Sequence, residues 1–312
     1  MQTGASQRAD AGPGPVGWRV WYDAARPKTL WASVAPVAIG SALALADGGF
    51  HAGAALACLA GALLIQIGTN FCNDYADFKK GADTAHRIGP VRATQAGLVS
   101  PQAMWRATVL VFGLAALVGA YLVVRGGWPL LVIALASIAA GIAYTAGPYA
   151  LAYLGLGDVF VLVFFGPVAV GGTYYVQTLH WPASATVAGL APGLISCALL
   201  AVNNLRDVEQ DRSARKRTLA VRFGAAFVRW EYIGGMALAI VGVPLVLWVW
   251  YDLTPWVLLA GLSLWPAWKP LQRMWSGTAG RELNPVLGQT ARVLLVYALF
   301  FTLGCIAGMF PT

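Results

Sequence analysis

Charge is scarce in this chain. Aspartate, glutamate, lysine and arginine make up 11% of the 312 residues, whereas 58% are hydrophobic. There are three histidines and four cysteines, without a Cys-x-x-Cys pair or a His/Cys cluster, which argues against a soft-metal site. A soluble domain would alternate apolar and polar positions, but apolar runs of about 20 residues recur here. The composition therefore predicts a polytopic membrane protein.

The apolar runs have the length of transmembrane helices, because about 20 helical residues cross the roughly 30 Å hydrocarbon core of a bilayer. A β-barrel would instead show short segments of alternating polarity. The predicted fold class is all-α, a bundle of nine transmembrane helices at residues 28–46, 51–72, 104–124, 128–147, 155–176, 186–206, 230–250, 254–270 and 290–310.

The N-terminal residues 1–17 differ from the rest of the chain. They are rich in glycine, alanine, proline and glutamine and contain no apolar run, so we expect a disordered tail. No short cleavable apolar segment precedes the first span, which is expected to remain as an uncleaved signal. Residues 18–312 are predicted to form a single intramembrane domain.

Basic residues fall almost entirely on one side of this topology. Twenty of the 21 lysines and arginines lie in the N-terminal segment or in the loops after spans two, four, six and eight, and only Arg125 lies opposite. Because cytoplasmic loops carry the excess of lysine and arginine, we expect a protein of the cytoplasmic (inner) membrane with its N-terminus in the cytoplasm. The net charge of +8 needs no nucleic-acid partner.

Two acidic segments interrupt the apolar chain, each at the end of a hydrophobic run. Asn70, Asp74 and Asp77 share one face of a helix, since positions i, i+4 and i+7 project together. A second stripe begins with the same Asn-x-x-x-Asp spacing 133 residues later, at Asn203, Asp207 and Asp211. The repeat predicts two related halves, with motifs at 70–83 and 203–211, facing a central cavity that opens to the cytoplasm.

Carboxylates in such a place require neutralising cations. The available ligands are all oxygens, which favours magnesium, and a diphosphate would complete its coordination shell. Donors for phosphate oxygens follow both segments, at Lys79, Lys80, Arg87, Arg92, Arg212, Arg215, Lys216, Arg217 and Arg222. The alternative is that these charges only cap helix ends at the membrane surface, but the duplicated pattern favours a binding site.

Longer strings around these segments resemble the UbiA-type intramembrane aromatic prenyltransferases. Residues 73–83 and 87–92 are similar to the first motif of the 1,4-dihydroxy-2-naphthoate polyprenyltransferases of menaquinone biosynthesis. Further similar strings occur at residues 25–30, 144–148, 154–158 and 216–224. The resemblance implies transfer of a polyprenyl group from its diphosphate to 1,4-dihydroxy-2-naphthoate with decarboxylation, giving demethylmenaquinol, next to membrane lipids.

The resemblance also assigns roles to residues. It implies two magnesium ions bridging the diphosphate, one held by Asn70, Asp74 and Asp77 and the other by Asn203, Asp207 and Asp211. Asp83 would hold metal or orient a basic neighbour, and Tyr144 would stabilise positive charge at the allylic carbon, unless it is an ordinary interfacial tyrosine. Diphosphate contacts are expected from Arg26, Lys79, Arg92 and Lys216.

Departures from the family pattern keep alternatives open. His86 replaces an acid usual in naphthoate-specific relatives, and Arg215 replaces a glycine. Pro148 stands where benzoate-type relatives carry lysine, which favours the naphthoate branch. One alternative is the same transfer to 4-hydroxybenzoate or homogentisate. A more distant one is an ion-coupled transporter with paired half-sites.

Overall fold

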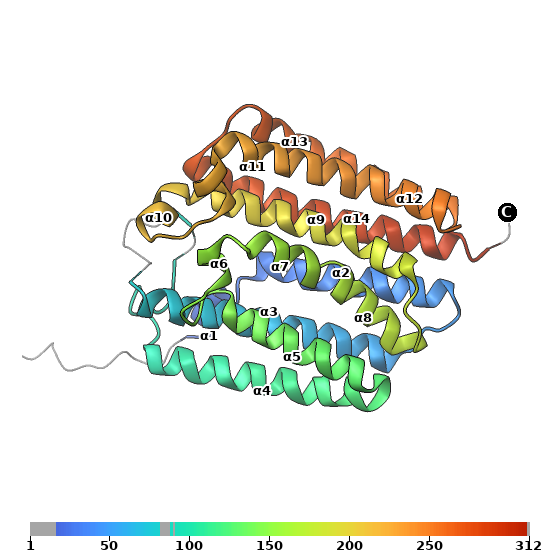
Figure 1. Cartoon of the computed structure of the whole chain (residues 1–312), viewed down its shortest axis with the longest axis horizontal. Coiled ribbons are helices and arrows are strands. Elements are labelled where there is room, and N and C mark those ends of the chain that lie inside the picture. The colour runs from blue at the N-terminus through green and yellow to red at the C-terminus, as the bar shows by residue number, and fades with distance from the viewer. Residues whose placement is uncertain (1–16, 82–87, 90, 311–312) are drawn as a thin grey trace, which may run out of the picture.

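The computed structural model describes residues 17–81, 88–89 and 91–310. Its helices run side by side along the long axis of the molecule and form a bundle (Figure 1). The described ranges contain no β-strand, which confirms the predicted all-α class. Residues 1–16 of the predicted tail lie outside the described ranges.

The chain folds into fourteen α-helices and three short helices of other types within the part that the structure describes. Their bounds are α1 (Trp18–Ala25), α2 (Pro27–Ala46), α3 (Ala52–Lys79), α4 (Pro101–Gly126), α5 (Trp128–Ala143), α6 (Leu151–Leu154), α7 (Gly157–Phe164), α8 (Pro167–Thr178), α9 (Ala183–Arg206), α10 (Val208–Ser213), α11 (Leu219–Ala237), η1 (Leu238–Gly242), α12 (Val243–Trp250), η2 (Pro255–Ser263), α13 (Leu264–Trp275), η3 (Gly280–Leu283) and α14 (Asn284–Ala307).

Multiple apolar helices make this a multi-pass membrane protein. Among the described residues, seven helical stretches are long and apolar enough to cross a bilayer, at Pro27–Ala46, Ala52–Lys79, Pro101–Gly126, Gly157–Thr178, Ala183–Arg206, Leu219–Trp250 and Gly280–Ala307. The predicted span 128–147 corresponds to α5, which is apolar but has 16 residues. The predicted span 254–270 is divided between the 3-10 helix η2 and α13. The count of nine spans therefore stays a prediction.

Helix α9 lies at the centre of the bundle and α4 at its edge. In α9, 72% of the most apolar window is buried inside the protein, against 22% in α4. The buried face of α9 consists largely of small residues, which allow close helix packing where lipid provides no hydrophobic driving force. Its neighbours α2, α11 and α14 contribute most of the remaining core.

A bend between α7 and α8 packs directly against α9. Helix α7 ends before Gly166, and Pro167 begins α8, where its missing N–H costs no hydrogen bond. A Cβ atom on Gly189 would lie 2.7 Å from the backbone of Pro167, and one on Gly193 would lie 2.6 Å from the carbonyl oxygen of Leu162. Only glycine at these two positions of α9 permits so close an approach.

Candidate functional site

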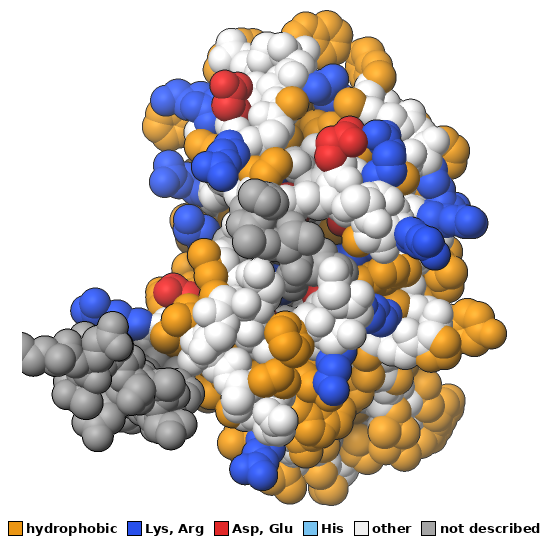
Figure 2. Space-filling view, turned by 90° about the vertical axis from the view of Figure 1, so that its left-hand side faces the viewer, with side chains coloured by type: hydrophobic (Ala, Val, Ile, Leu, Met, Phe, Trp, Pro, Cys, Tyr) orange, Lys and Arg blue, Asp and Glu red, His pale blue; other side chains and the backbone are white. Residues whose placement is uncertain are grey.

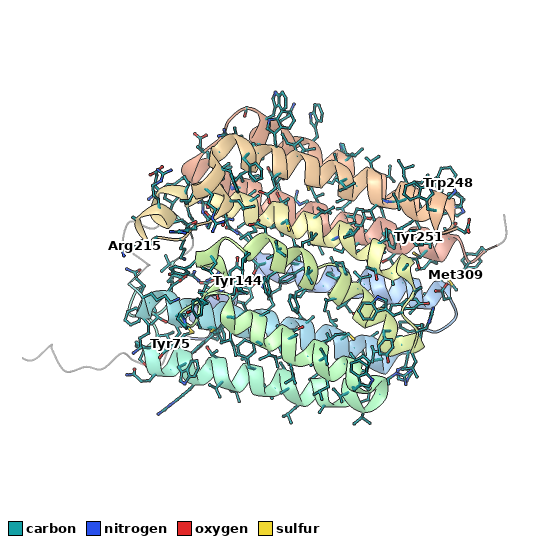
Figure 3. All side chains as sticks on the ribbon, viewed as in Figure 1. Tyr75, Tyr144, Arg215, Trp248, Tyr251 and Met309 are labelled. Atoms are coloured by element: carbon teal, nitrogen blue, oxygen red, sulfur yellow. The ribbon has the colours of Figure 1, made fainter. Side chains whose placement is uncertain are left out.

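Both acidic segments lie at one end of the bundle, on the left in Figure 1. Tyr75 of α3 and Arg215, which follows α10, mark this end, and Tyr144 lies between them (Figure 3). Figure 2 views the end directly and shows lysine and arginine side chains distributed around it. The two acidic segments therefore lie close together in the structure, and lysine and arginine side chains surround them.

The first acidic segment forms the last turns of α3. The helix continues to Lys79, so Asn70, Asp74 and Asp77 share one face, as expected. All three are buried, with exposed fractions of 3%, 2% and 1%. Buried carboxylates without partners would be unstable, so their contacts decide what they can do.

Asp74 forms two hydrogen bonds with the backbone of the loop that follows α3. Its Oδ2 accepts a hydrogen bond from the backbone N–H of Ala93 at 2.9 Å, and its Oδ1 accepts one from the N–H of Thr94 at 3.0 Å. In this arrangement the carboxylate of Asp74 orders the chain next to Arg92.

Asp77 is neutralised by two cations that are distant in sequence. The Nη2 of Arg92 lies 3.0 Å from its Oδ2, and the Nζ of Lys216 lies 3.3 Å from its Oδ1. The hydroxyl of Tyr153 also donates to Oδ1, at 3.3 Å. Arg92 and Lys216 are two of the four residues predicted to bind the diphosphate. In the structure both contact Asp77, a predicted metal ligand.

Tyr153, in the short helix α6, was missed by sequence reasoning. Its ring lies 4.3 Å from the Nζ of Lys80 and 5.0 Å from the Nζ of Lys216, within the range of cation–π attraction. Its position between two predicted spans, on the same side as the basic loops, is the only signal in the sequence. The ring of Tyr153 therefore lies close to the ammonium groups of both Lys80 and Lys216, and its hydroxyl contacts Asp77.

Lys80 enters this cluster, whereas Lys79 does not. The Nζ of Lys80 donates to the carbonyl oxygens of Thr145 at 2.7 Å and Gly147 at 3.1 Å. Burial lowers the pKa of Lys80, while Asp77 raises it and the charge of Lys216 lowers it further. The Nζ of Lys79 instead lies 5.9 Å from the ring of Tyr75.

The second acidic segment is divided between two helices. Helix α9 ends at Arg206, Asp207 follows with φ −99° and ψ 12°, and α10 begins at Val208. The N–H of Asp211 still donates to the carbonyl oxygen of Asp207 at 2.8 Å, so the two residues remain one turn apart. The stripe that we expected on one helix therefore crosses a break in it.

Asp207 is paired with its own neighbour. The Nε and Nη2 of Arg206 donate to its two carboxylate oxygens at 2.8 and 2.7 Å, and the Nη1 of Arg206 donates to the Oδ1 of Asn284 at 3.1 Å. A bidentate guanidinium holds a carboxylate in a defined orientation. Arg206 was not among the predicted site residues, although its place beside Asp207 was visible in the sequence.

A largely apolar cavity of about 320 Å³ runs from the acidic segments along the bundle. Its polar end is lined by Asn70, Asn203, Arg26 and Tyr144, and apolar walls follow at Ile65, Leu122, Leu130, Phe160, Phe164 and Phe165. Cys58 lines the cavity twelve residues before Asn70 on α3, about 18 Å along the helix axis. The cavity joins a polar mouth to a long apolar interior.

The mouth of the cavity is fixed by backbone contacts. The Nδ2 of Asn70 donates to the carbonyl oxygen of Ala25 at 2.8 Å, which ties α3 to the turn between α1 and α2. Arg26 in that turn has φ 55°, a left-handed conformation that non-glycine residues rarely adopt. Backbone strain of this kind is concentrated at functional sites. A Cβ atom on Gly157 would lie 3.2 Å from the Oη of Tyr144, so the glycine leaves room for this hydroxyl.

The donors at the cavity mouth suit a hard divalent cation. The amide groups of Asn70, Asn73 and Asn203, from both segments, line the cavity there, and lysine and arginine neutralise Asp77 and Asp207. No group of three or more His, Cys, Asp or Glu side chains close enough to hold a metal occurs in the described ranges, so amide oxygens would belong to the ligand set. Asp83 lies outside the described residues.

Comparisons with known proteins agree on one family. The model of the UbiA prenyltransferase family matches residues 33–286. The chain is 39% identical over 282 residues to the 1,4-dihydroxy-2-naphthoate octaprenyltransferase of Mycobacterium tuberculosis, covering 89% of this chain and 94% of that protein. It is 36% identical over 298 residues to the octaprenyltransferase of the same name from Escherichia coli, covering 92% and 94%.

Solved structures share the fold at low sequence identity. A UbiA homolog from Archaeoglobus fulgidus, bound to GPP and Mg²⁺, aligns with a TM-score of 0.64 and 17% identity over 93% of this chain and 99% of that one. The apo structure of a UbiA homolog from Aeropyrum pernix K1 aligns with a TM-score of 0.67 and 15% identity over 89% and 98%.

Proposed function

Because the chain belongs to the UbiA prenyltransferase family, we propose that it transfers a polyprenyl group from polyprenyl diphosphate to 1,4-dihydroxy-2-naphthoate. The products are demethylmenaquinol, carbon dioxide and diphosphate. The observation that carries this proposal is the cavity, where Asn70 and Asn203, one from each acidic segment, line the polar end of an apolar interior. Such a cavity can hold a charged head and an apolar tail together.

The basic residues around Asp77 bind the diphosphate. Arg92 and Lys216 lie on the Asp77 carboxylate, and phosphate oxygens offer them a stronger partner. Arg26 lies at the cavity mouth. Lys79 lies two residues after Asp77, and its Nζ would leave the ring of Tyr75, 5.9 Å away, to reach the diphosphate. We assign diphosphate contacts to all four residues. When the diphosphate binds, Arg92 and Lys216 leave the carboxylate of Asp77 and bind phosphate oxygens instead.

A magnesium cofactor fits the oxygen donors at the mouth. Bound there, two ions would neutralise the diphosphate and improve it as a leaving group. The residues that would hold them are Asn70, Asp74, Asp77, Asn203, Asp207 and Asp211, with Asp83 as a further ligand or orienting group. The A. fulgidus homolog bound to GPP and Mg²⁺ supports the metal, and the number of ions is our proposal.

The cavity walls direct the reaction. The allylic carbon–oxygen bond breaks with both electrons leaving on diphosphate, and the electron-rich naphthoate ring forms the new carbon–carbon bond. Loss of carbon dioxide returns an electron pair to the ring. Tyr144 lines the cavity beside Asn70 and Asn203, where its ring stabilises positive charge on the allyl group. Apolar side chains keep water from this cation.

Two alternative functions can be distinguished from this one by experiment. The same chemistry could act on 4-hydroxybenzoate or homogentisate, but the relatives at 36% and 39% identity are naphthoate octaprenyltransferases. An ion-coupled transporter would place its acids in the middle of the spans. Here Asp74 and Asp77 lie in the last turns of the 28-residue α3.

The topology belongs to the same proposal. We place the N-terminus and the cavity mouth on the cytoplasmic side of the inner membrane, because twenty of the 21 basic residues lie on that side of the predicted topology. We also retain nine spans and two related halves, with residues 18–312 as one domain. These assignments rest on charge distribution and on the repeated acidic segments.

An acceptor panel tests the proposed function. Membranes containing the protein are incubated with labelled octaprenyl diphosphate and each of the three acceptors, with magnesium or with a chelator, and prenylated products are measured by mass spectrometry. We expect magnesium-dependent product from the naphthoate alone. Product from another acceptor but not from the naphthoate would contradict the substrate assignment. Membranes containing the D207N variant provide the background.

A further inference from the structure

A second hollow lies on the surface of the bundle, separate from the cavity. A groove of about 880 Å³ runs between α11 and α13 and is lined by Ile233, Trp268, Lys269, Gln272, Arg273 and Trp275, among others. Helix α13 forms most of it. None of these six residues lines the cavity described above.

The sequence of α13 separates a buried face from a groove face. Ala267, Pro270 and Met274 are buried, and they follow the spacing of one helix face. Two adjacent stripes with i, i+4 and i+7 spacing line the groove, at Trp268, Gln272 and Trp275 and at Lys269, Arg273 and Ser276. One stripe carries indole rings and the next carries two cations.

The aromatic stripe forms an exposed apolar wall. The exposed fractions of Trp268 and Trp275 are 63% and 68%. The ring of Trp275 meets that of Trp230 on α11 edge to face, with centroids 5.4 Å apart, which joins α13 to α11 beside the groove. Exposed indoles of this kind are typical of the border between hydrocarbon and headgroups.

The cationic stripe lacks protein counter-ions. Within the described part of the chain, neither Lys269 nor Arg273 forms an ion pair. Lys269 lies six residues before the end of α13, about 9 Å along the helix, so its flexible stem can carry the ammonium toward the headgroup level near Arg273. Two adjacent positive charges therefore lie beside apolar walls at the membrane border.

The groove lies at the same end of the bundle as the acidic segments. The Nη2 of Arg229 donates to the carbonyl oxygen of Gly277, just after α13, at 2.9 Å. The chain then passes through η3 to Asn284, which accepts a hydrogen bond from Arg206 beside Asp207. Lipids of the leaflet at this end can reach the groove.

We propose that the groove between α11 and α13 binds an anionic diacyl phospholipid, with its phosphate on Lys269 and Arg273 and an acyl chain along Trp268, Trp275 and Ile233. Charge complementarity selects this occupant, because a zwitterionic lipid would bring its own cation to the two basic side chains. Basic pockets between transmembrane helices bind anionic headgroups in this way. The site is independent of prenyl transfer.

Lipid retention tests the site without measuring activity. The full-length protein is purified in detergent with equal amounts of phosphatidylglycerol and phosphatidylcholine, and bound lipids are counted by native mass spectrometry. We expect enrichment of phosphatidylglycerol, which K269Q/R273Q lowers by about fivefold per removed charge, or about 25-fold in total. The matched control R106Q/R281Q removes two exposed cations outside the groove and should retain the enrichment.

Two further measurements use the unchanged protein. Raising the salt concentration should reduce the enrichment, because the contact is electrostatic. Inorganic phosphate at millimolar concentration should not displace the lipid, because it lacks the acyl contacts. Equal retention of both lipids, equal loss in the control variant, or displacement by inorganic phosphate would each overturn the proposal.

Discussion

The two acidic segments begin with the same spacing but are held in different ways. In the first, Asp74 and Asp77 lie on an unbroken helix and are bound by groups from a distant loop and from the segment after α10. In the second, the helix breaks at Asp207, whose partner is the adjacent Arg206. The side chain of Asp207 is 13% exposed and that of Asp77 1%.

This difference separates two kinds of preorganisation. The first segment depends on tertiary contacts, so a change there disturbs both the site and the packing of the loop around Arg92. The second depends on a local guanidinium clamp anchored to α14 through Asn284. We therefore expect changes in the first segment to alter stability and activity together, and changes in the second to act mainly on activity.

The largest expected effect is on turnover when either half loses its carboxylate. D74N and D207N should each reduce prenyl transfer at least about 100-fold, because under the proposed function each removes a carboxylate that would hold magnesium at the diphosphate. Initial rates with labelled octaprenyl diphosphate provide the measurement. Unchanged turnover in either variant would refute the metal role of that segment and break the symmetry of the two halves.

The next effect concerns stability. R92Q removes a buried partner of Asp77 and should lower the free energy of unfolding by about 3 kcal/mol. The control is R212Q, because Arg212 pairs with Glu209 at the surface, where a pair contributes at most about 1 kcal/mol. Thermal unfolding in detergent compares the two variants. Equal shifts in melting temperature would contradict the importance of the Asp77 pair.

A smaller effect is expected at the clamp of the second segment. R206Q should lower turnover about tenfold and raise the magnesium concentration needed for half-maximal rate, because Asp207 loses its orienting partner. R206K keeps the charge but not the fork, so it should recover part of the loss. A magnesium dependence identical to the unchanged protein would show that Arg206 does not position Asp207.

The smallest effect is expected at Tyr153. Y153L removes the ring beside Lys80 and Lys216 and should raise the KM for the prenyl diphosphate about twofold to fivefold, with little change in kcat. Y153F keeps the ring and loses a hydroxyl contact of 3.3 Å, so its KM should change by less than about twofold. The reverse order of the two variants would assign the role to the hydroxyl.

Much of the site follows from local spacing, and the rest does not. The face shared by Asn70, Asp74 and Asp77 was predictable, because it depends only on helical periodicity within α3. The pairing of Asp77 with Arg92 and Lys216 joins residues 15 and 139 positions apart, which periodicity cannot reveal. Tyr153 was missed for the same reason.

Helix breaks set a second limit on prediction. The pattern of Asn203, Asp207 and Asp211 is compatible with one continuous helix, yet α9 ends at Arg206 where the guanidinium takes up the Asp207 carboxylate. The predicted span 254–270 is likewise divided into η2 and α13, and its apolar composition does not indicate where one helix ends and the other begins. Hydropathy locates such segments without defining their internal geometry.

The contact of Gly189 and Gly193 with the bend between α7 and α8 has a consequence for the shape of the cavity. The two glycines do not line the cavity, but the helix they support carries Phe160 and Phe164, which do. An added methyl group at either glycine would meet the backbone of this bend at less than 3.0 Å, so the bend would have to shift. The shape of the cavity can therefore change through residues that do not line it, while the residues at its mouth stay the same.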